Sequence, residues 1–222
     1  MDGDGDFRSA EVCKLRDEAD IIVTNPPFSL FREFFAWIIK GKKKFVIIAS
    51  NQSPTYKDVF SEIKKNRVWY GNGFERGNAF FRVLEKREYA GGVYDEKTGL
   101  VKFRNCIWLT NIDHGKRHEP LQLMTMADNI KYSKHNEIRG HGYVRYDNYD
   151  AIEVKYADAI PIDYEGIMGV SVTFLEKYCP EQFEIVGNET DLGLSKGRGY
   201  VNGKRLAGRI FIRKIKNYEE RT

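Results

Sequence analysis

Asp-Ile-Ile-Val-Thr-Asn-Pro-Pro-Phe, residues 20–28, is the stretch of sequence that decides the fold. Its first five residues form a short, mainly apolar run, a pattern typical of a strand that is buried on both faces. Pro26 and Pro27 have no backbone N–H to donate, so they end the strand and stiffen the loop that follows. The stretch therefore predicts a buried strand that stops at a rigid, polar corner.

A helix and a second strand are predicted directly after this corner. Phe45–Ala49 is another apolar run typical of a buried strand. Before it, apolar residues recur at the spacing of an amphipathic helix that runs into Gly41: Phe31, Phe34, Phe35, Ile38 and Ile39. Strand, helix and strand predict a βαβ unit with a right-handed crossover and parallel strands. An earlier helix is predicted over Ser9–Glu18, with Ser9 as its N-cap.

The remainder of the chain is richer in strand patterns. Thr55–Asp58 reads as a capping box that opens a helix through Phe60 and Ile63. Asn202-Gly203 is typical of a type I′ turn and predicts a hairpin over Tyr200–Arg205. Other strands are predicted at residues 68–70, 79–83, 101–103, 106–109 and 209–213. We therefore predict an α/β fold, with a doubly wound, mostly parallel, partial Rossmann-like sheet in residues 1–85 and a β-rich remainder in residues 86–222.

Composition narrows the class of protein. The 222 residues are 41% hydrophobic and 31% charged, which is typical of a soluble globular chain. No apolar run approaches the roughly 20 residues of a membrane span, and residues 1–6 are acidic where a secretory signal is basic. The cysteines are widely separated and lack paired spacing, which favours neither a disulfide framework nor a zinc site: Cys13, Cys106 and Cys179. A cytoplasmic location is the resulting expectation.

Positive charge is concentrated near the C-terminus. The net charge is +4, and from Gly187 onward nine cations face four anions, a surplus of five. The cations are Lys196, Arg198, Lys204, Arg205, Arg209, Arg213, Lys214, Lys216 and Arg221. A face that contacts phosphates and an ordinary solvated surface explain this surplus about equally well.

The residues after the first strand offer a specific chemistry, because ligands of open α/β sheets bind beyond the carboxyl ends of the strands. The side-chain oxygen of Asn25 and the carbonyl of Pro26 can accept both hydrogens of an exocyclic amine, which frees the nitrogen lone pair to attack a methyl group. Phe28 offers a stacking face. Such catalysis relies on positioning and aimed dipoles rather than on a metal. The alternative is that Asn-Pro-Pro is only a sharp turn.

Asn-Pro-Pro-Phe after a buried strand resembles the catalytic motif of amino-methylating, S-adenosylmethionine-dependent DNA methyltransferases. Longer stretches are similar to the EcoRI-type adenine methyltransferases in particular: residues 5–9, 18–33, 108–114, 146–152, 166–170 and 174–185. The resemblance implies methyl transfer to the amino group of a flipped adenine in double-stranded DNA. It implies that Asn25 and Pro26 accept the amine hydrogens, that Pro27 completes the stiff corner on which they lie, and that Phe28 stacks on the adenine. It also implies that Asp6 and Phe7 contact the adenine of the cofactor.

The chain departs from this family at its beginning. Family members place a glycine-rich strand-loop and an acidic residue upstream of the Asp-Phe segment, whereas only five residues precede Asp6 here. Gly71–Gly77 is no replacement, because it follows the catalytic loop. We therefore expect that the chain is a truncated product and that it binds the cofactor poorly on its own. A complementing polypeptide is one source of the missing motif. The sequence carries no signal for an oligomeric state.

Two functional hypotheses compete with catalysis on DNA. In the first hypothesis, the chain is a non-catalytic, DNA-binding remnant of a restriction–modification methylase. The second keeps the chemistry but takes protein glutamine or an RNA base as substrate, since the same short motif occurs in such methylases. The family-like stretches in the second half of the chain argue against the latter.

Two further groups are candidates for substrate binding. Phe80 and Phe81 lie on a predicted strand after the catalytic unit and offer a second stacking face for adenine. Strand aromatics more often pack inward, so a core pair is the commoner outcome. His114, Lys116 and Arg117 form a basic cluster with His118 that suits phosphate contact, and a solvated loop explains them nearly as well.

Overall fold

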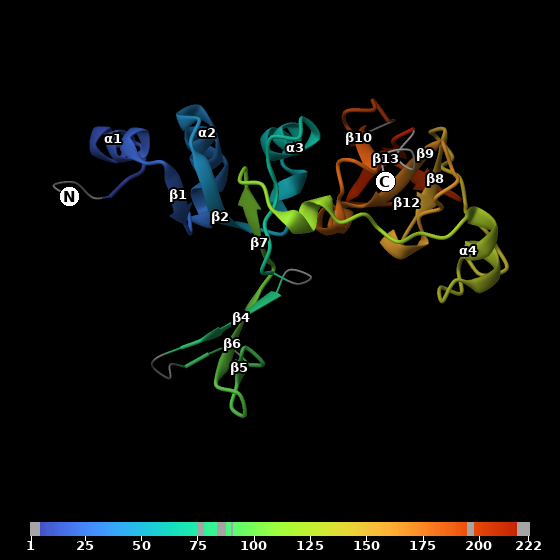
Figure 1. The fold of residues 1–222 in the computed structure, drawn as a ribbon, viewed down its shortest axis with the longest axis horizontal. Coiled ribbons are helices and arrows are strands. Elements are labelled where there is room, and N and C mark those ends of the chain that lie inside the picture. The colour runs from blue at the N-terminus through green and yellow to red at the C-terminus, as the bar shows by residue number, and fades with distance from the viewer. Residues whose placement is uncertain (1–4, 75–77, 84–87, 90, 195–197, 217–222) are drawn as a thin grey trace. The chain divides into compact units, whose positions relative to one another are not determined.

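The computed structural model describes residues 5–74, 78–83, 88–89, 91–194 and 198–216. The chain divides into two compact units, Met1–His114 and Gly115–Thr222 (Figure 1). This division falls beyond the boundary near residue 85 that the sequence suggests, because a strand at Cys106–Thr110 pairs back into the first sheet of the chain. The catalytic and DNA-recognition roles of the two parts stay a prediction.

The first unit contains the predicted βαβ element. β1 (Ile21–Thr24) and β2 (Lys44–Ser50) pair in parallel, and α2 (Phe31–Gly41) connects them. α2 buries one face of its helix, as its periodicity predicts, through Phe31, Phe34, Phe35 and Ile38. α1 (Ala10–Glu18) begins as predicted at Ser9, whose hydroxyl accepts a hydrogen bond from the backbone N–H of Val12 at 3.2 Å. The positions of the helices and strands predicted in residues 9–50 are therefore confirmed.

The first sheet is mixed rather than mostly parallel, and the prediction needs correction here. Its described order is β1-β2-β7-β3, with β7 (Cys106–Thr110) antiparallel to both β2 and β3 (Trp69–Tyr70). A parallel strand needs a crossover that returns the chain to the other end of the sheet. β7 has none, because only Asn105 separates it from β6 (Leu100–Arg104), which belongs to another sheet.

The prediction that β1 is buried on both faces is wrong. Val23 is 70% exposed and Ile21 is 51% exposed, whereas Phe45 and Ile47 of β2 are fully buried. β1 is the edge strand of the described sheet, and within the described residues one of its faces has no covering layer. An apolar run records which side chains favour burial, but burial itself depends on neighbouring elements.

The capping box predicted at Thr55–Asp58 is also corrected. Thr55 ends a short 3-10 turn, η2 (Ser53–Thr55), and its hydroxyl donates to the carbonyl of Gln52 at 2.7 Å. α3 (Lys57–Lys64) instead begins after Tyr56, without a side-chain cap. The helix exists as expected and buries Val59, Phe60 and Ile63, so only the assignment of its first turn fails.

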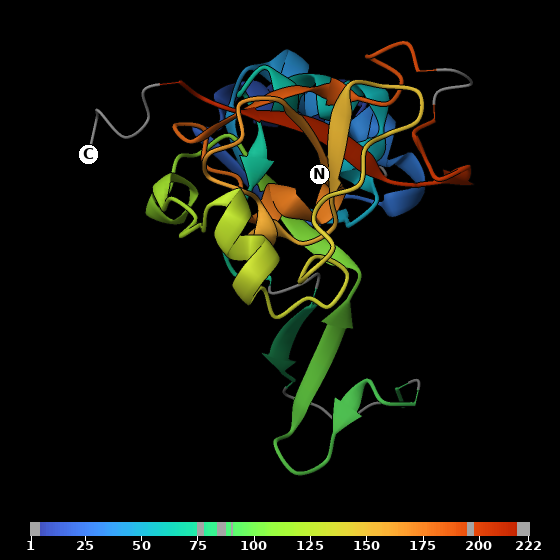
Figure 2. The ribbon, with the colours of Figure 1, turned by 90° about the vertical axis from the view of Figure 1, so that its right-hand side faces the viewer.

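A second, smaller sheet completes the first unit. β4 (Asn78–Arg82) and β5 (Tyr94–Asp95) both pair with β6 in antiparallel fashion, in the order β4-β6-β5. Figures 1 and 2 show these strands side by side and apart from the first sheet of the unit. The strand patterns in this part of the sequence are confirmed.

The second unit is built around a four-stranded sheet with the order β10-β13-β9-β8. Its strands are β8 (Ala151–Val154), β9 (Ile167–Ser171), β10 (Phe183–Asn188) and β13 (Arg209–Lys214), and α4 (Met126–Tyr132) is its α-helix. The remaining 3-10 turns of the chain are η1 (Phe28–Leu30), η3 (Gly115–His118), η4 (Ala157–Ala159) and η5 (Val172–Lys177). Met168, Phe211 and Ile212 are fully buried in the core of this unit.

The predicted hairpin forms β11 (Tyr200–Val201) and β12 (Lys204–Arg205). Asn202 and Gly203 have φ angles of 49° and 71°, as a type I′ turn requires. The carboxylate of Asp147 accepts hydrogen bonds from both of their backbone N–H groups, at 3.1 and 2.8 Å. Asn148 accepts from the backbone of Tyr200 at 3.1 Å. Part of the family-like stretch 146–152 thus holds the hairpin to the unit.

Candidate active site

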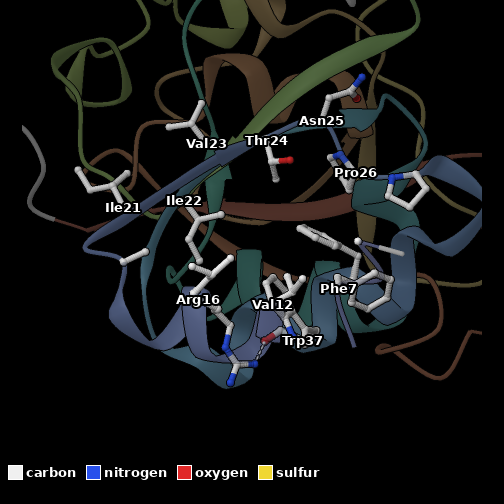
Figure 3. Close-up of a pocket in the computed structure, with 15 residues that line it drawn as sticks. Phe7, Val12, Arg16, Ile21, Ile22, Val23, Thr24, Asn25, Pro26 and Trp37 are labelled. Carbon is white, nitrogen blue, oxygen red and sulfur yellow. Dashed lines mark hydrogen bonds between the residues drawn. The ribbon is translucent and has the colours of Figure 1, made fainter. Parts of the chain in front are cut away.

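A pocket of about 440 Å³ lies along β1 in the first unit. β1 and the loop that follows it form one side, and α1 with two aromatic residues of α2, Phe34 and Trp37, forms the other. Figure 3 shows Phe7, Val12 and Trp37 across this pocket from the residues of β1. The pocket therefore opens where sequence reasoning places a ligand, at the carboxyl end of a parallel strand.

Three of the predicted catalytic residues lie in the lining of this pocket: Asn25, Pro26 and Pro27. Asn25 is exposed at the rim, whereas Pro26 is buried beneath it. The carbonyl of Pro27 accepts a hydrogen bond from Leu30 at 3.1 Å, which fixes the turn. Phe28 begins η1, is 46% exposed and does not line the pocket.

The polar groups of Asn25 and Pro26 are available to a ligand. Within the described part of the chain, neither the Asn25 carboxamide nor the Pro26 carbonyl takes part in a hydrogen bond. The exposed carboxamide of Asn25 and the carbonyl of the buried Pro26 therefore stand on a stiff loop beside the pocket. This arrangement can hold the two hydrogens of an amino group without breaking any bond within the protein.

Phe7 supplies an aromatic wall to the pocket. Its side chain is 8% exposed and packs edge-on against Phe34, with ring centroids 5.3 Å apart, and against Trp37 at 5.8 Å. Arg16 lies over the ring of Trp37 at 4.9 Å and donates to its backbone carbonyl at 3.0 Å. Sequence reasoning missed Trp37 and Arg16, although the helical spacing of Phe34 and Trp37 was a usable signal.

Asp6 is held by a neighbour rather than turned into the pocket. Its carboxylate forms an ion pair with Arg8 at 2.6 Å and accepts from the backbone N–H of Arg8 at 2.8 Å. The side-chain hydrogen bond from Arg8 is the largest cause that lowers the pKa of Asp6 to about 2. Arg8 also pairs with Glu33 of α2 at 3.2 Å. The structure thus brings Phe7, but not Asp6, into the pocket lining.

We predict that Arg8→Gln raises the pKa of the Asp6 carboxyl from about 2 toward its ordinary 3.8. The variant loses the charged donor but keeps the backbone N–H, so the return is expected to be incomplete. NMR titration of the Asp6 carboxyl carbon measures the change. Lys14→Gln is the matched control, because Lys14 is exposed and pairs with Glu18 rather than Asp6. An unchanged pKa in the Arg8 variant would contradict the assignment.

The other sequence candidates are not among the residues that line this pocket. Phe80 and Phe81 are 60% and 44% exposed on β4, so the expectation of a core pair is wrong. Neither face of the small sheet is covered well enough by other described residues to bury Phe80 or Phe81. His114 is half-buried, and its Nε2 donates to the carbonyl of Tyr70 at 2.8 Å. Lys116 and Arg117 belong to η3 at the start of the second unit, where Lys116 is exposed.

The basic segment after Gly187 carries less free charge than its composition indicates. Arg209 is engaged with Glu153 at 2.7 Å, Arg213 with Glu184 at 2.6 Å and Lys216 with Glu165 at 3.5 Å. Lys196 and Arg221 lie outside the described residues. Lys204 and Arg205 are exposed on the β11–β12 hairpin. Contact of this segment with phosphates stays a prediction.

The described residues show neither a metal-binding cluster nor a membrane-spanning helix. No group of three or more His, Cys, Asp or Glu side chains there is arranged to hold a metal ion. Within the same residues, no helix combines the length and the apolar character of a membrane span. Cys13, Cys106 and Cys179 are free thiols, and burial raises the pKa of the latter two.

Comparison with known proteins decides the family. A family model described as adenine-specific methyltransferase EcoRI matches residues 1–220. The chain belongs to this family. No solved structure matches it. The stretches that resembled EcoRI-type enzymes in the sequence therefore reflect membership across the whole chain.

Relatives in three bacteria have similar sequences. The chain is 44% identical over 214 residues to the type II methyltransferase M.EcoRI of Escherichia coli, which covers 95% of this chain. It is 34% identical over 232 residues to M.MgeORF184P of Mycoplasma genitalium and 34% over 191 residues to M.MpnI of Mycoplasma pneumoniae, with 96% and 83% of this chain covered. The chain spans 62%, 70% and 56% of the lengths of these relatives, in the same order.

Proposed function

We propose that this member of the EcoRI family transfers a methyl group from S-adenosylmethionine to the exocyclic amino nitrogen of a flipped adenine in double-stranded DNA. One observation carries the proposal. The Asn25 carboxamide and the Pro26 carbonyl stand at the carboxyl end of β1, beside an aromatic-walled pocket, with no hydrogen-bond partner in the described residues. Family membership and the three type II methyltransferase relatives support the same reaction.

The residues present fit an adenosine-bearing cofactor in part. The pocket volume of about 440 Å³ lies within the ordinary range for small-molecule sites. Phe7 offers an aromatic surface, and Asp6 offers an acceptor for an amino group once Arg8 releases it. When bound, S-adenosylmethionine supplies an electrophilic methyl group. The β1-α2-β2 crossover with its site at the strand ends supports a Rossmann-like arrangement of this sheet.

Catalysis in this proposal follows from positioning. The Asn25 side-chain oxygen and the Pro26 carbonyl accept the two amino hydrogens of the adenine. The nitrogen then becomes more tetrahedral, and its lone pair is aimed at the methyl group. Phe28, exposed beside this corner, stacks on the extruded base. The acceptors are fixed before the reaction begins, and no strong base is required, because the methylated nitrogen is cationic and releases its surplus proton readily to water.

The two units are proposed to divide the work. The first unit holds the catalytic corner together with three substrate-binding candidates, Phe80, Phe81 and His114. The β-rich second unit contributes to DNA recognition, with Lys116 and Arg117 as further candidates. A cytoplasmic location is also part of the proposal.

Transfer of a radiolabelled methyl group tests the proposal. The chain is mixed with labelled S-adenosylmethionine and unmethylated genomic DNA, and the digested nucleosides are separated. We expect label in N6-methyldeoxyadenosine. Calorimetric titration with S-adenosylmethionine accompanies the assay. Absence of both label and heat at millimolar cofactor, with DNA binding intact, would overturn catalysis by this chain and favour the DNA-binding remnant.

A further inference from the structure

The small sheet of the first unit has two chemically different faces. In antiparallel pairing, side chains of directly opposed residues share a face, and neighbours along a strand alternate. Phe80 is opposite Lys102 and Asn78 is opposite Arg104, so these residues share one face with Arg82. Ala79, Phe81, Val101 and Phe103 occupy the other face. The register therefore separates Phe80 from Phe81, which sequence reasoning had grouped together.

One of these faces combines an exposed aromatic ring with three cations, and we call it the Phe80 face: Phe80, Arg82, Lys102 and Arg104. Phe80 is 60% exposed, and the ammonium group of Lys102 lies 5.8 Å from its ring centroid. Arg82 and Arg104 are exposed as well, and Arg104 donates a hydrogen bond to the carbonyl of Gly92. The opposite face is apolar, with Phe81 and Phe103 in edge-to-face contact at 6.1 Å.

The cations of the Phe80 face are not balanced by carboxylates of the described residues. Among the described residues, no carboxylate lies within ion-pair distance of Arg82, Lys102 or Arg104. Asp95 shares the face at its far corner, but it accepts a hydrogen bond from the backbone N–H of Lys97 at 2.9 Å, which lowers its pKa. In the second unit, by contrast, the cations Arg209 and Arg213 both have carboxylate partners.

We propose that the Phe80 face binds double-stranded DNA, with its cations on backbone phosphates and Phe80 in apolar contact beside them. Three cations without an ion pair in the described residues suit a polyanion, and an exposed ring among them suits the sugars and bases of a nucleic acid. A two-stranded β-ribbon has the size that the major groove of B-form DNA accepts. The β4–β6 pair is such a ribbon, and β5 joins it only at one end. The inference rests on the proposed function, because it locates the DNA contact of the same reaction.

Binding of a fluorescein-labelled duplex, measured by anisotropy without cofactor at several salt concentrations, tests this inference. The triple variant Arg82→Gln, Lys102→Gln and Arg104→Gln is expected to bind every duplex more weakly than the unchanged chain. Its plot of log affinity against log salt should become shallower by about 2 to 3, close to one unit for each lost phosphate contact. Because all three side chains reach solvent, the fold is expected to survive.

A charge-matched control removes three cations elsewhere in the same unit, with Lys40→Gln, Lys44→Gln and Lys57→Gln. These lysines are exposed, and Lys40 and Lys44 lie near the amino end of β2, opposite the edge that carries Asn25. We expect the control to keep nearly the original salt dependence. Equal losses in the two triple variants would overturn the inference, since they would reflect net charge alone.

A second pair of variants separates the aromatic contact from the charges. Phe80→Ala should weaken duplex binding by about fivefold or more with an unchanged salt dependence. Phe103→Ala removes an exposed ring from the opposite face of the same sheet and should leave affinity unchanged. Unaltered binding in both the triple variant and Phe80→Ala would overturn the inference and leave the proposed function standing. Failure of the unchanged chain to bind any duplex would instead contradict the proposed function.

Discussion

Replacing Asn25 with alanine is expected to lower the rate of methyl transfer to DNA by about 100- to 1000-fold, the typical loss when one preorganised polar group is removed from a transition state. The reason is the geometry at the end of β1. Asn25 supplies one of two acceptors on the loop, and the Pro26 carbonyl alone cannot draw both amino hydrogens out of the plane of the base. The rate of label incorporation at saturating DNA measures the effect.

The position of Asn25 allows an effect on activity to be separated from an effect on folding. The side chain is exposed and has no partner among the described residues, so its loss should leave thermal unfolding unchanged. Asn51→Ala is a matched control, because Asn51 is also exposed and follows β2 as Asn25 follows β1. Asn25→Asp keeps an acceptor oxygen and should lose less activity than alanine. Full activity of the alanine variant would refute the role of Asn25.

Glu153→Gln is expected to destabilise the second unit by about 3–5 kcal/mol, the usual cost of leaving one partner of a buried ion pair without its charge. The Glu153 side chain is 9% exposed and that of Arg209 is 15% exposed, with their nearest atoms 2.7 Å apart. Arg209 contacts both carboxylate oxygens through its Nε, and the Tyr146 hydroxyl donates to the same carboxylate. Glutamine keeps the shape but leaves the guanidinium charge uncompensated.

Hydrogen exchange of the β9 and β13 amides reports this loss, because it isolates the second unit from the first. Glu184→Gln is the control, since Glu184 and Arg213 are about half exposed and such pairs contribute at most about 1 kcal/mol. A double variant, Glu153→Met with Arg209→Leu, should recover most of the protection because it removes both charges. Normal protection in Glu153→Gln would mean that water already screens the pair.

The elements that were predictable from sequence are those that are formed by interactions between residues close together in the chain. Ser9 caps α1 because its hydroxyl reaches a nearby N–H, and Asn202-Gly203 makes its turn because the two φ angles are intrinsic to those residues. The end of β1 was predictable for the same reason, since Pro26 and Pro27 cannot continue a strand.

The failures share a different cause, which is dependence on distant or competing partners. The apolar residues of β1 required a covering layer to be buried, and Val23 has none in the described structure. Thr55 found a carbonyl in η2 instead of a helix N–H. The pairing of Phe80 with Lys102 required the β4–β6 register, which connects residues far apart in the chain. Arg8 captures Asp6 across only two residues, so that contact was within reach of sequence reasoning.

The outer side of β1 has a consequence for the behaviour of the protein in solution. Within the described residues this strand pairs only with β2, so its other edge presents backbone donors and acceptors beside two uncovered aliphatic side chains, Ile21 and Val23. Such an edge is a template on which a further strand can add, and no lysine or proline interrupts it. We therefore expect a sample limited to these residues to associate along this strand at high concentration, and a charge at position 23 should reduce that association.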